Sequence, residues 1–181
     1  MTQITLKGKP IHKEVSMVQI TLKGKPIHTV GTLPTIHSHA PDFVLVNQNL
    51  EDVSLSHFKG KQKLLATAPS IDTDVCSTMT KHLNAFAHKH PKLAILVVTA
   101  DLPFAQKRFC GIEHIHSLTT LSMMRNKDFG RSYGVLIQDG PLEGVLARSL
   151  LILDEENRVL YEELVPEITQ EPDYHKALAA L

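Results

Sequence analysis

The only two thiols of the chain, Cys76 and Cys110, are the side chains best suited to covalent chemistry. Cys76 ends the stretch PSIDTDVC, residues 69–76, which follows an apolar segment. Beyond it, apolar residues recur every three or four positions and predict a helix from Asp74 to about His90. These residues are Val75, Met79, Leu83 and Phe86. Cys76 then lies in the first helical turn, where unpaired N–H groups and the helix dipole stabilise an anion, so we expect it to be a nucleophilic thiolate.

A thiolate at this position needs a positive partner that the neighbouring sequence does not supply. Asp72 and Asp74 oppose a negative charge on Cys76, and the nearest cation after it in the chain is Lys81. The balancing cation is therefore expected from a distant part of the chain. Thr73 or Asp74 is expected to cap the start of the helix, because hydroxyl and carboxylate oxygens accept from the first free N–H groups.

Cys110 has a different setting. The stretch LPFAQKRFCG, residues 102–111, predicts a short helix with Pro103 in its first turn and Gly111 just past its end. Cys110 is then the last helical residue, at the negative end of the dipole, which does not favour its thiolate. Two unequal thiols are the arrangement expected when one is oxidised to a sulfenic acid and the other condenses with it. The ordinary alternative is a pair of inert core cysteines.

Composition excludes several classes of protein. The 181 residues suit one domain, and 19 Lys and Arg balance 19 Asp and Glu, which argues against nucleic acid as a partner. No apolar run is long enough to cross a membrane, and the N-terminus lacks a signal-peptide pattern. The chain is expected to be cytoplasmic, with no membrane partner. Two cysteines are too few for a disulfide framework, so a bond between them is expected to belong to a reaction cycle.

The N-terminal region contains a repeat. QITLKGKPIH occurs at residues 3–12 and again, unchanged, at 19–28. Each copy has the pattern of a short strand, a turn and a second strand. Two short copies cannot build a repeat fold, which needs about three or more units. We therefore expect residues 1–16 to be an extension outside the core fold and residues 17–181 to form the domain.

The remaining pattern predicts an α/β domain. Residues 63–69 and 92–100 are apolar runs typical of buried strands, and each is followed by one of the two helical patterns above. Residues 149–165 predict a strand hairpin with a polar turn at 155–157. Further strands are expected at 40–46 and near LTTLSM, with helices at KDFGRSYG and at the C-terminus. This order indicates a thioredoxin-like fold: a central mixed sheet, helices on both faces and an N-terminal β-hairpin.

PSIDTDVC resembles the active-site pattern of the peroxiredoxins, in which Pro69, Thr73 and Cys76 match the Pro, Thr and peroxidatic Cys. Three further stretches are similar to the thiol peroxidase branch, the atypical two-cysteine peroxiredoxins of bacteria. They are ADLPFAQKRFCG, YGVLIQDGPLEGVLARSLLILD and EITQEPDYHKALAAL. The resemblance runs in order over residues 17–181.

The resemblance implies a function for each cysteine. Cys76 would be peroxidatic and Cys110 resolving, and their intramolecular disulfide would be reduced by thioredoxin. The substrates would be hydrogen peroxide and organic hydroperoxides, no cofactor or metal would be needed, and the role would be antioxidant defence. It also supplies the missing cation, because Arg148 in LARS matches the family arginine beside the peroxidatic sulfur.

The same resemblance assigns roles to the surrounding residues. Arg148 would stabilise the thiolate and polarise the peroxide, the Thr73 hydroxyl would hold sulfur and peroxide oxygen in line, and Pro69 would exclude water. Alone, each has an ordinary structural explanation: surface ion pair, helix cap and strand terminator. A homodimer is also implied, with the Arg148 region and the loop before Pro69 near the interface. One departure is Thr67-Ala68, where the family often has an aromatic residue.

Three other functions remain open from the residues. Paired histidines such as His37 and His39, His88 and His90, and His114 and His116 can bind zinc or copper, although no cysteine or carboxylate lies at ligand spacing. A thioredoxin-like disulfide exchanger would have two cysteines two residues apart, and Cys76 is followed by Ser, Thr and Met. A cysteine hydrolase would need a histidine tied to Cys76 by a recognisable motif.

Overall fold

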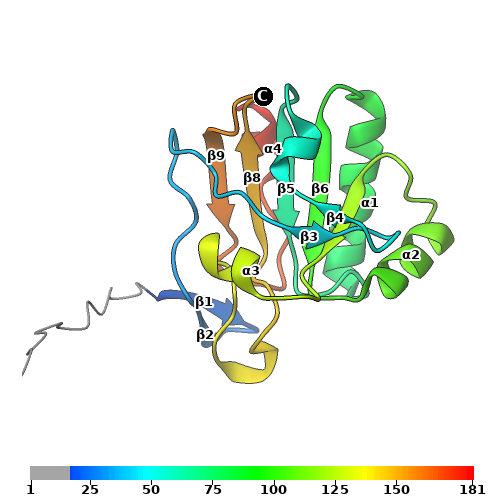
Figure 1. Ribbon diagram of the computed structural model, residues 1–181. Coiled ribbons are helices and arrows are strands. Elements are labelled where there is room, and N and C mark those ends of the chain that lie inside the picture. Colours follow the sequence, from blue (N-terminus) through cyan, green and yellow to red (C-terminus); the bar gives the residue numbers. More distant parts are fainter. Residues whose placement is uncertain (1–16) are drawn as a thin grey trace, which may run out of the picture.

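The computed structural model describes residues 17–181, and a seven-stranded mixed sheet forms its centre (Figure 1). The strands are β3 (Leu45–Val46), β4 (Asp52–Val53), β5 (Lys63–Thr67), β6 (Ala94–Thr99), β7 (Thr119–Ser122), β8 (Ser149–Leu153) and β9 (Val159–Leu164). Their order across the sheet is β4-β3-β7-β6-β5-β8-β9. The pairs β5–β6 and β6–β7 are parallel and the other neighbours antiparallel, which confirms the mixed sheet.

Helices cover both faces of this sheet. They are α1 (Asp74–Lys89), α2 (Pro103–Ile112), α3 (Asp128–Ser132) and α4 (Tyr174–Leu178), with 3-10 turns η1 (Leu55–Phe58) and η2 (Gly140–Leu142). In Figure 1, α1 lies behind the central strands and α3 in front of them. None of the helices in residues 17–181 is long and apolar enough to cross a membrane.

Alternation along β5 shows how one strand serves two cores. All five of its residues are buried. Leu64 and Ala66 pack with Met79 of α1, whereas Leu65 belongs to the opposite core, which contains Phe129 of α3. Successive side chains of a strand point to opposite faces, so a strand covered on both faces has apolar residues at consecutive positions, here residues 64–66. The predicted arrangement of helices on both faces is confirmed.

The strand predicted at 40–46 is wrong for most of its length. Only Leu45–Val46 pairs in the sheet, next to the two-residue strand β4, which the pattern did not indicate. Side-chain hydrogen bonds hold the preceding residues instead: the Tyr133 hydroxyl donates to the Pro41 carbonyl at 2.7 Å, and an Asp42 carboxylate oxygen accepts from the Leu55 N–H at 3.1 Å. The chain is therefore held without a neighbouring strand.

The end of α2 also differs from the prediction. Gly111 lies inside the helix, which continues to Ile112. The left-handed residue that ends it is His114, with φ of 54°, and the Ile115 N–H closes the turn on the Cys110 carbonyl at 2.9 Å. A left-handed residue after the last turn is a common helix terminator, and glycine is only its commonest occupant. Cys110 stays in the last turn but is not the last residue.

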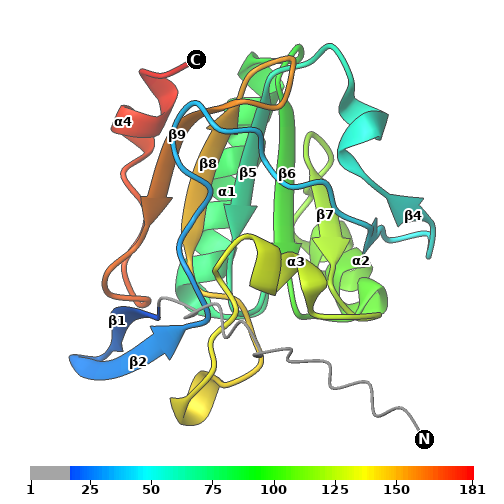
Figure 2. The same cartoon turned by 60° about the vertical axis from the view of Figure 1, so that its left-hand side comes forward.

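The N-terminal hairpin is confirmed as β1 (Val18–Leu22) and β2 (Lys25–Thr29), which form a separate two-stranded sheet (Figure 2). Lys23 and Gly24 join the strands with positive φ values of 51° and 76°, as expected of a tight hairpin turn. Thr21 fastens the hairpin to the main body: its N–H donates to the Pro166 carbonyl at 2.7 Å. The predicted extension, residues 1–16, lies outside the described residues.

Glu167 is the main anchor of this hairpin, and its replacement by glutamine is expected to lower the thermal unfolding midpoint. Its carboxylate accepts from Thr169, from the Gly24 and Lys23 N–H groups and from the Thr21 hydroxyl. These bonds, first of all the one from the Thr169 hydroxyl, hold the pKa of Glu167 well below its usual range. Because the folded pKa is lowered, this stabilisation is present above about pH 4.5 and is lost as the pH falls further.

Thermal unfolding of the parent and Glu167→Gln between pH 3 and pH 7 measures this contribution. The difference in midpoint should be largest near pH 7 and shrink below about pH 4.5. Glu143→Gln serves as the control, because Glu143 is a carboxylate in another loop that makes no described side-chain hydrogen bond among residues 17–181. A difference that is constant with pH would contradict a role for the carboxylate charge.

Candidate active site

Cys76 is the third residue of α1 and is fully buried. Thr73 is the N-cap residue, in an extended conformation with φ of −97° and ψ of 149°, and its carbonyl accepts from the Ser77 N–H at 2.8 Å. The predicted helix start is therefore confirmed. The Thr73 side chain, however, makes no capping hydrogen bond. Its hydroxyl donates instead to the sulfur of Cys76, with Oγ1 and Sγ 2.8 Å apart.

Arg148 supplies the cation that the local sequence lacks. It lies immediately before β8, is only 2% exposed, and its Nη2 lies 3.3 Å from Cys76 Sγ. The guanidinium also donates from Nε and Nη2 to the Ile168 carbonyl, both at 3.1 Å, and Nη1 lies 3.6 Å from Met79 Sδ. None of these partners in residues 17–181 is a carboxylate. A buried charge without a counter-charge is costly. Among these partners, the Cys76 sulfur is the one that can carry a negative charge.

Two other charged groups near the start of α1 have partners of their own. Lys81, the nearest cation after Cys76 in the sequence, pairs with Glu113 at 2.6 Å. Asp72 faces Arg108 at 3.4 Å, and both side chains are about two-thirds exposed. Solvent screens such exposed charges strongly, so Asp72 opposes a thiolate less than its position in the sequence suggests.

Cys110 lies in a separate small cluster with Ile71, Phe109 and Ile115 and is 4% exposed. Burial raises the pKa of its thiol, and hydrogen bonding with Thr120 and Gln48 offsets this only in part. Both cysteines are free thiols in this structure. At Cys110, burial is thus the largest cause of the raised pKa.

Gln48 and Thr120 are site residues that the sequence pattern did not indicate. The Gln48 amide Nε2 donates to Thr120 Oγ1 at 2.7 Å, which leaves the Thr120 hydroxyl proton free to point at the neighbouring Cys110 sulfur. Gln48 follows β3 and Thr120 belongs to β7, so only the pairing of these two strands brings them together. Nothing in either local segment signals the contact.

The predicted residues are thus placed unequally. The structure brings the Thr73 hydroxyl and the Arg148 guanidinium each within hydrogen-bond distance of the Cys76 sulfur. Pro69 is buried and lies two residues past β5, which ends at Thr67 and not at Pro69 as expected; no hydrogen bond described in residues 17–181 links it to the sulfur. Cys110 is in the other cluster, so the two sulfurs are not bonded in this arrangement.

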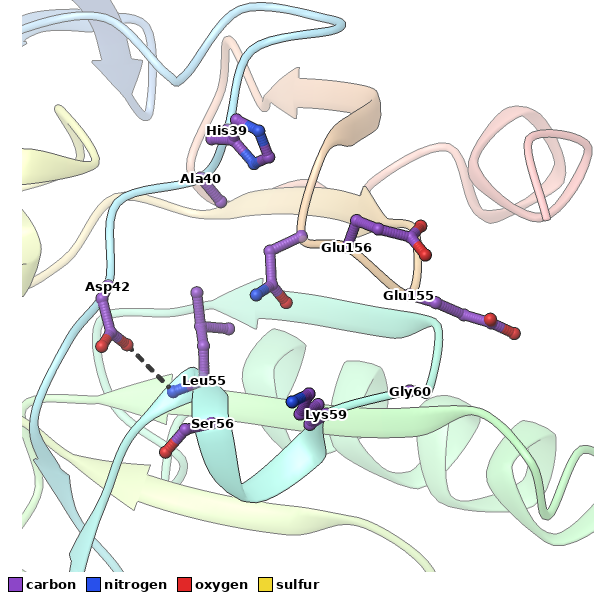
Figure 3. A pocket seen from close by; sticks show the side chains of 10 residues that line it. His39, Ala40, Asp42, Leu55, Ser56, Lys59, Gly60, Glu155 and Glu156 are labelled. Carbon is purple, nitrogen blue, oxygen red and sulfur yellow. Dashed lines mark hydrogen bonds between the residues drawn. The ribbon is translucent and has the colours of Figure 1, made fainter.

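Two hollows help to locate the reactive surface. One of about 330 Å³ lies between the start of α1 and α2, and its walls include Thr73, Ser77 and Phe109. Thr73, whose hydroxyl contacts the Cys76 sulfur, is one of its lining residues. A larger hollow of about 590 Å³ is lined by His39, Asp42 and other residues that include neither cysteine (Figure 3). Volume alone is therefore a poor guide to the chemistry here.

The histidine pairs do not form a metal centre in the part of the chain that the structure describes. No group of three or more His, Cys, Asp or Glu residues in 17–181 is placed to hold a metal ion. The rings of His114 and His116 are 6.4 Å apart between centroids. The metal-binding alternative therefore has no ligand set among these residues.

Comparison with known proteins shows the family to which the chain belongs. The sequence model of the Redoxin family matches residues 36–178. A thiol peroxidase of Leptospira interrogans is 45% identical over 182 residues, covering 99% of this chain and 97% of that protein. The chain belongs to the redoxin family and, within it, to the thiol peroxidases. It is therefore a peroxidase of the peroxiredoxin type, as the sequence resemblance implied.

Solved structures agree with this membership. A peroxiredoxin-like protein from Aquifex aeolicus superposes with a TM-score of 0.83 at 39% identity, covering 91% of this chain and 99% of that one. A thiol peroxidase from Chromobacterium violaceum gives a TM-score of 0.84 at 26% identity, with 89% and 93% covered. The predicted thioredoxin-like fold of this thiol peroxidase is confirmed.

Proposed function

We propose that this thiol peroxidase reduces hydrogen peroxide and organic hydroperoxides through a sulfenic acid at Cys76 and an intramolecular disulfide between Cys76 and Cys110. The observation that carries the proposal is the pairing of a buried guanidinium with a thiol: Arg148 is 2% exposed and donates to Cys76 Sγ at 3.3 Å. A charge-assisted hydrogen bond of this kind favours the nucleophilic thiolate.

The first step is displacement at oxygen. The Cys76 thiolate attacks one peroxide oxygen, the S–O bond forms and the O–O bond breaks, and the leaving oxygen departs as water or an alcohol after taking up a proton. The sulfur is oxidised by two electrons to a sulfenic acid. Arg148 and Thr73 donate to the sulfur and lie where they can also donate to the oxygens, whose negative charge grows in the transition state.

The second step joins the two sulfurs. The Cys110 thiolate attacks the Cys76 sulfur, the S–S bond forms and the S–O bond breaks, and the hydroxide leaves as water after taking up the proton that the Cys110 thiol released. Because the cysteines are buried in different clusters, at least one helix end must unwind first. We assign this to α2, whose Phe104 and Ile112 are more than half exposed and so contribute little buried apolar surface to hold the helix in place.

Thioredoxin is the proposed reductant. Its two thiols supply the two electrons that return Cys76 and Cys110 to the free form, by thiol–disulfide exchange. A homodimer, with its interface near the Arg148 region and the loop before Pro69, and a cytoplasmic location are parts of the same proposal. They are supported by the resemblance to the atypical two-cysteine peroxiredoxins.

Intact mass spectrometry tests the cycle. The reduced protein, treated with one equivalent of hydrogen peroxide, should lose the mass of two hydrogens as the disulfide forms. Cys110→Ser should instead gain one oxygen at Cys76, and Cys76→Ser should not change on the same timescale. A parent protein that keeps its mass would contradict the proposal, and a disulfide that forms only between chains would contradict intramolecular resolution.

A further inference from the structure

The Asp101 carboxylate accepts two hydrogen bonds from the loop that leads to Cys76. Asp101 lies two residues after the end of β6, and both of its oxygens are occupied. Oδ1 accepts from the Ser70 hydroxyl at 2.8 Å, and Oδ2 accepts from the Ile71 N–H at 2.6 Å. Both partners belong to the short loop between β5 and α1. Short hydrogen bonds to a carboxylate are among the stronger ones in proteins, so this loop is held firmly to the end of β6.

The backbone of Asp101 is itself fixed to the sheet. The Ser122 hydroxyl donates to its carbonyl at 2.5 Å, and its N–H donates to Thr99 Oγ1 at 3.3 Å. Thr99 Oγ1 also accepts from the amide of Gln106 at 3.0 Å. Gln106 is a fully buried residue of α2, one helical turn before Cys110. The hydrogen-bond network therefore runs from the loop before Cys76 to the helix that carries Cys110.

Apolar packing follows the same route. Ile71, whose N–H is held by Asp101, is 1% exposed and packs in the cluster with Phe109 and Cys110. If the loop moves away from Asp101, Ile71 leaves this cluster, and the packing that covers Cys110 is lost. The position of the loop and the burial of Cys110 are thus physically coupled through one residue.

We infer that Asp101 is a positioning residue of the peroxidase reaction. It fastens the loop before Cys76 to the end of β6, just before α2 begins. It thereby stabilises the closed arrangement, in which Cys76 reacts with peroxide, relative to the opened arrangement, in which the two sulfurs bond. The inference rests on the proposed function, because it concerns the relative rates of the two proposed steps, oxidation of Cys76 and formation of the disulfide. Asp101 does not touch the sulfur; it acts through Ser70 and Ile71.

Asp101→Ala removes both hydrogen bonds and tests the inference. Rapid mixing with hydrogen peroxide should show oxidation of Cys76 slowed by about tenfold, since two bonds to a charged group are lost. Disulfide formation after oxidation should be at least as fast as in the parent. Asp101→Asn should restore the oxidation rate to within about threefold, because an amide can accept from the Ile71 N–H and donate to the Ser70 oxygen.

A second measurement does not depend on peroxide chemistry. In the fully reduced proteins, alkylation of Cys110 by iodoacetamide, followed by peptide mass, should be about tenfold faster in Asp101→Ala than in the parent. Asp139→Ala is the matched control: its carboxylate also makes two hydrogen bonds, to the N–H and ring of His28, far along the chain from both cysteines. Both rates should stay at the parent values in this control.

Three outcomes would overturn the inference: parent-like rates in Asp101→Ala, an equal fall in both reaction steps, or no rescue by Asp101→Asn. Should Asp101→Ala fail to fold, Ser70→Ala removes one of the two bonds and must shift the same two measurements in the same directions by a smaller factor. A parent that does not react with peroxide would refute the proposed function, whereas the alkylation result would still decide whether Asp101 couples the loop to Cys110.

Discussion

Arg148→Lys is expected to lower the second-order rate constant for oxidation of Cys76 by hydrogen peroxide by about 10² to 10³. Lysine keeps the charge but replaces a planar fork of donors by a single ammonium group. The guanidinium now spans the Ile168 carbonyl and the Cys76 sulfur at once, with distances of 3.1 and 3.3 Å. An ammonium group on a shorter, flexible stem cannot hold both contacts in this geometry. Stopped-flow measurement of Cys76 oxidation at several peroxide concentrations provides the rate constant.

The matched control for this variant is Arg131→Lys. Arg131 is exposed, and within residues 17–181 it pairs only with Asp128, one helical turn earlier in α3, at 3.4 Å. Its replacement should leave the rate constant unchanged. Thermal unfolding of Arg148→Lys separates an effect on chemistry from loss of folded protein. A rate constant within about threefold of the parent, in a folded variant, would mean that charge alone suffices and that the fork geometry is unimportant.

Thr73→Val is expected to slow the same step by about 10², because it removes the hydroxyl that donates to Cys76 Sγ at 2.8 Å. Valine has almost the same shape, and the Thr73 side chain makes no capping hydrogen bond to α1, so the helix should lose no cap. Rapid-mixing kinetics with hydrogen peroxide, as for Arg148, measures the effect.

Thr73→Ser keeps the hydroxyl and is the control. It should stay within about threefold of the parent, since serine can make the same hydrogen bond with slightly more rotational freedom. Thr78→Val provides a second control in the same helix, because the Thr78 hydroxyl only donates back to the Asp74 carbonyl at 2.9 Å. If Thr73→Val reacted as fast as Thr73→Ser, the 2.8 Å contact would have no part in catalysis.

Much of the fold follows from local patterns, for identifiable reasons. β5 and β6 contain runs of consecutive apolar residues because helices cover both sides of the sheet, and such runs stand out in a sequence. The hairpin of β8 and β9 has a polar turn between alternating strands. By contrast, β4 has two residues and the chain before β3 is held by side chains of Asp42 and Tyr133. Contacts of that kind depend on tertiary packing and leave no periodic signal.

The residues of the site also divide into those that a local pattern indicates and those that only tertiary packing brings together. Thr73 and Cys76 are three residues apart, so the helix pattern already brings them together. The need for a cation could be argued from the adjacent aspartates, but its identity as Arg148 came from the family resemblance, because 72 positions separate it from Cys76. Thr120 and Asp101 were not anticipated. Their roles arise from the side-by-side placement of strand ends, which no single segment encodes.

The complete burial of the Cys76 side chain, taken with the activation by Arg148 that we propose, separates reactivity from accessibility. Reagents that attack thiols in a cell differ greatly in bulk, and each must displace atoms around this sulfur before it can react. A peroxide presents a slender pair of oxygens and requires the smallest displacement, whereas a large electrophile requires the surrounding chain to part. Steric exclusion therefore selects among reagents: the buried Cys76 thiol is accessible to a small peroxide and shielded from bulkier molecules that react with thiols.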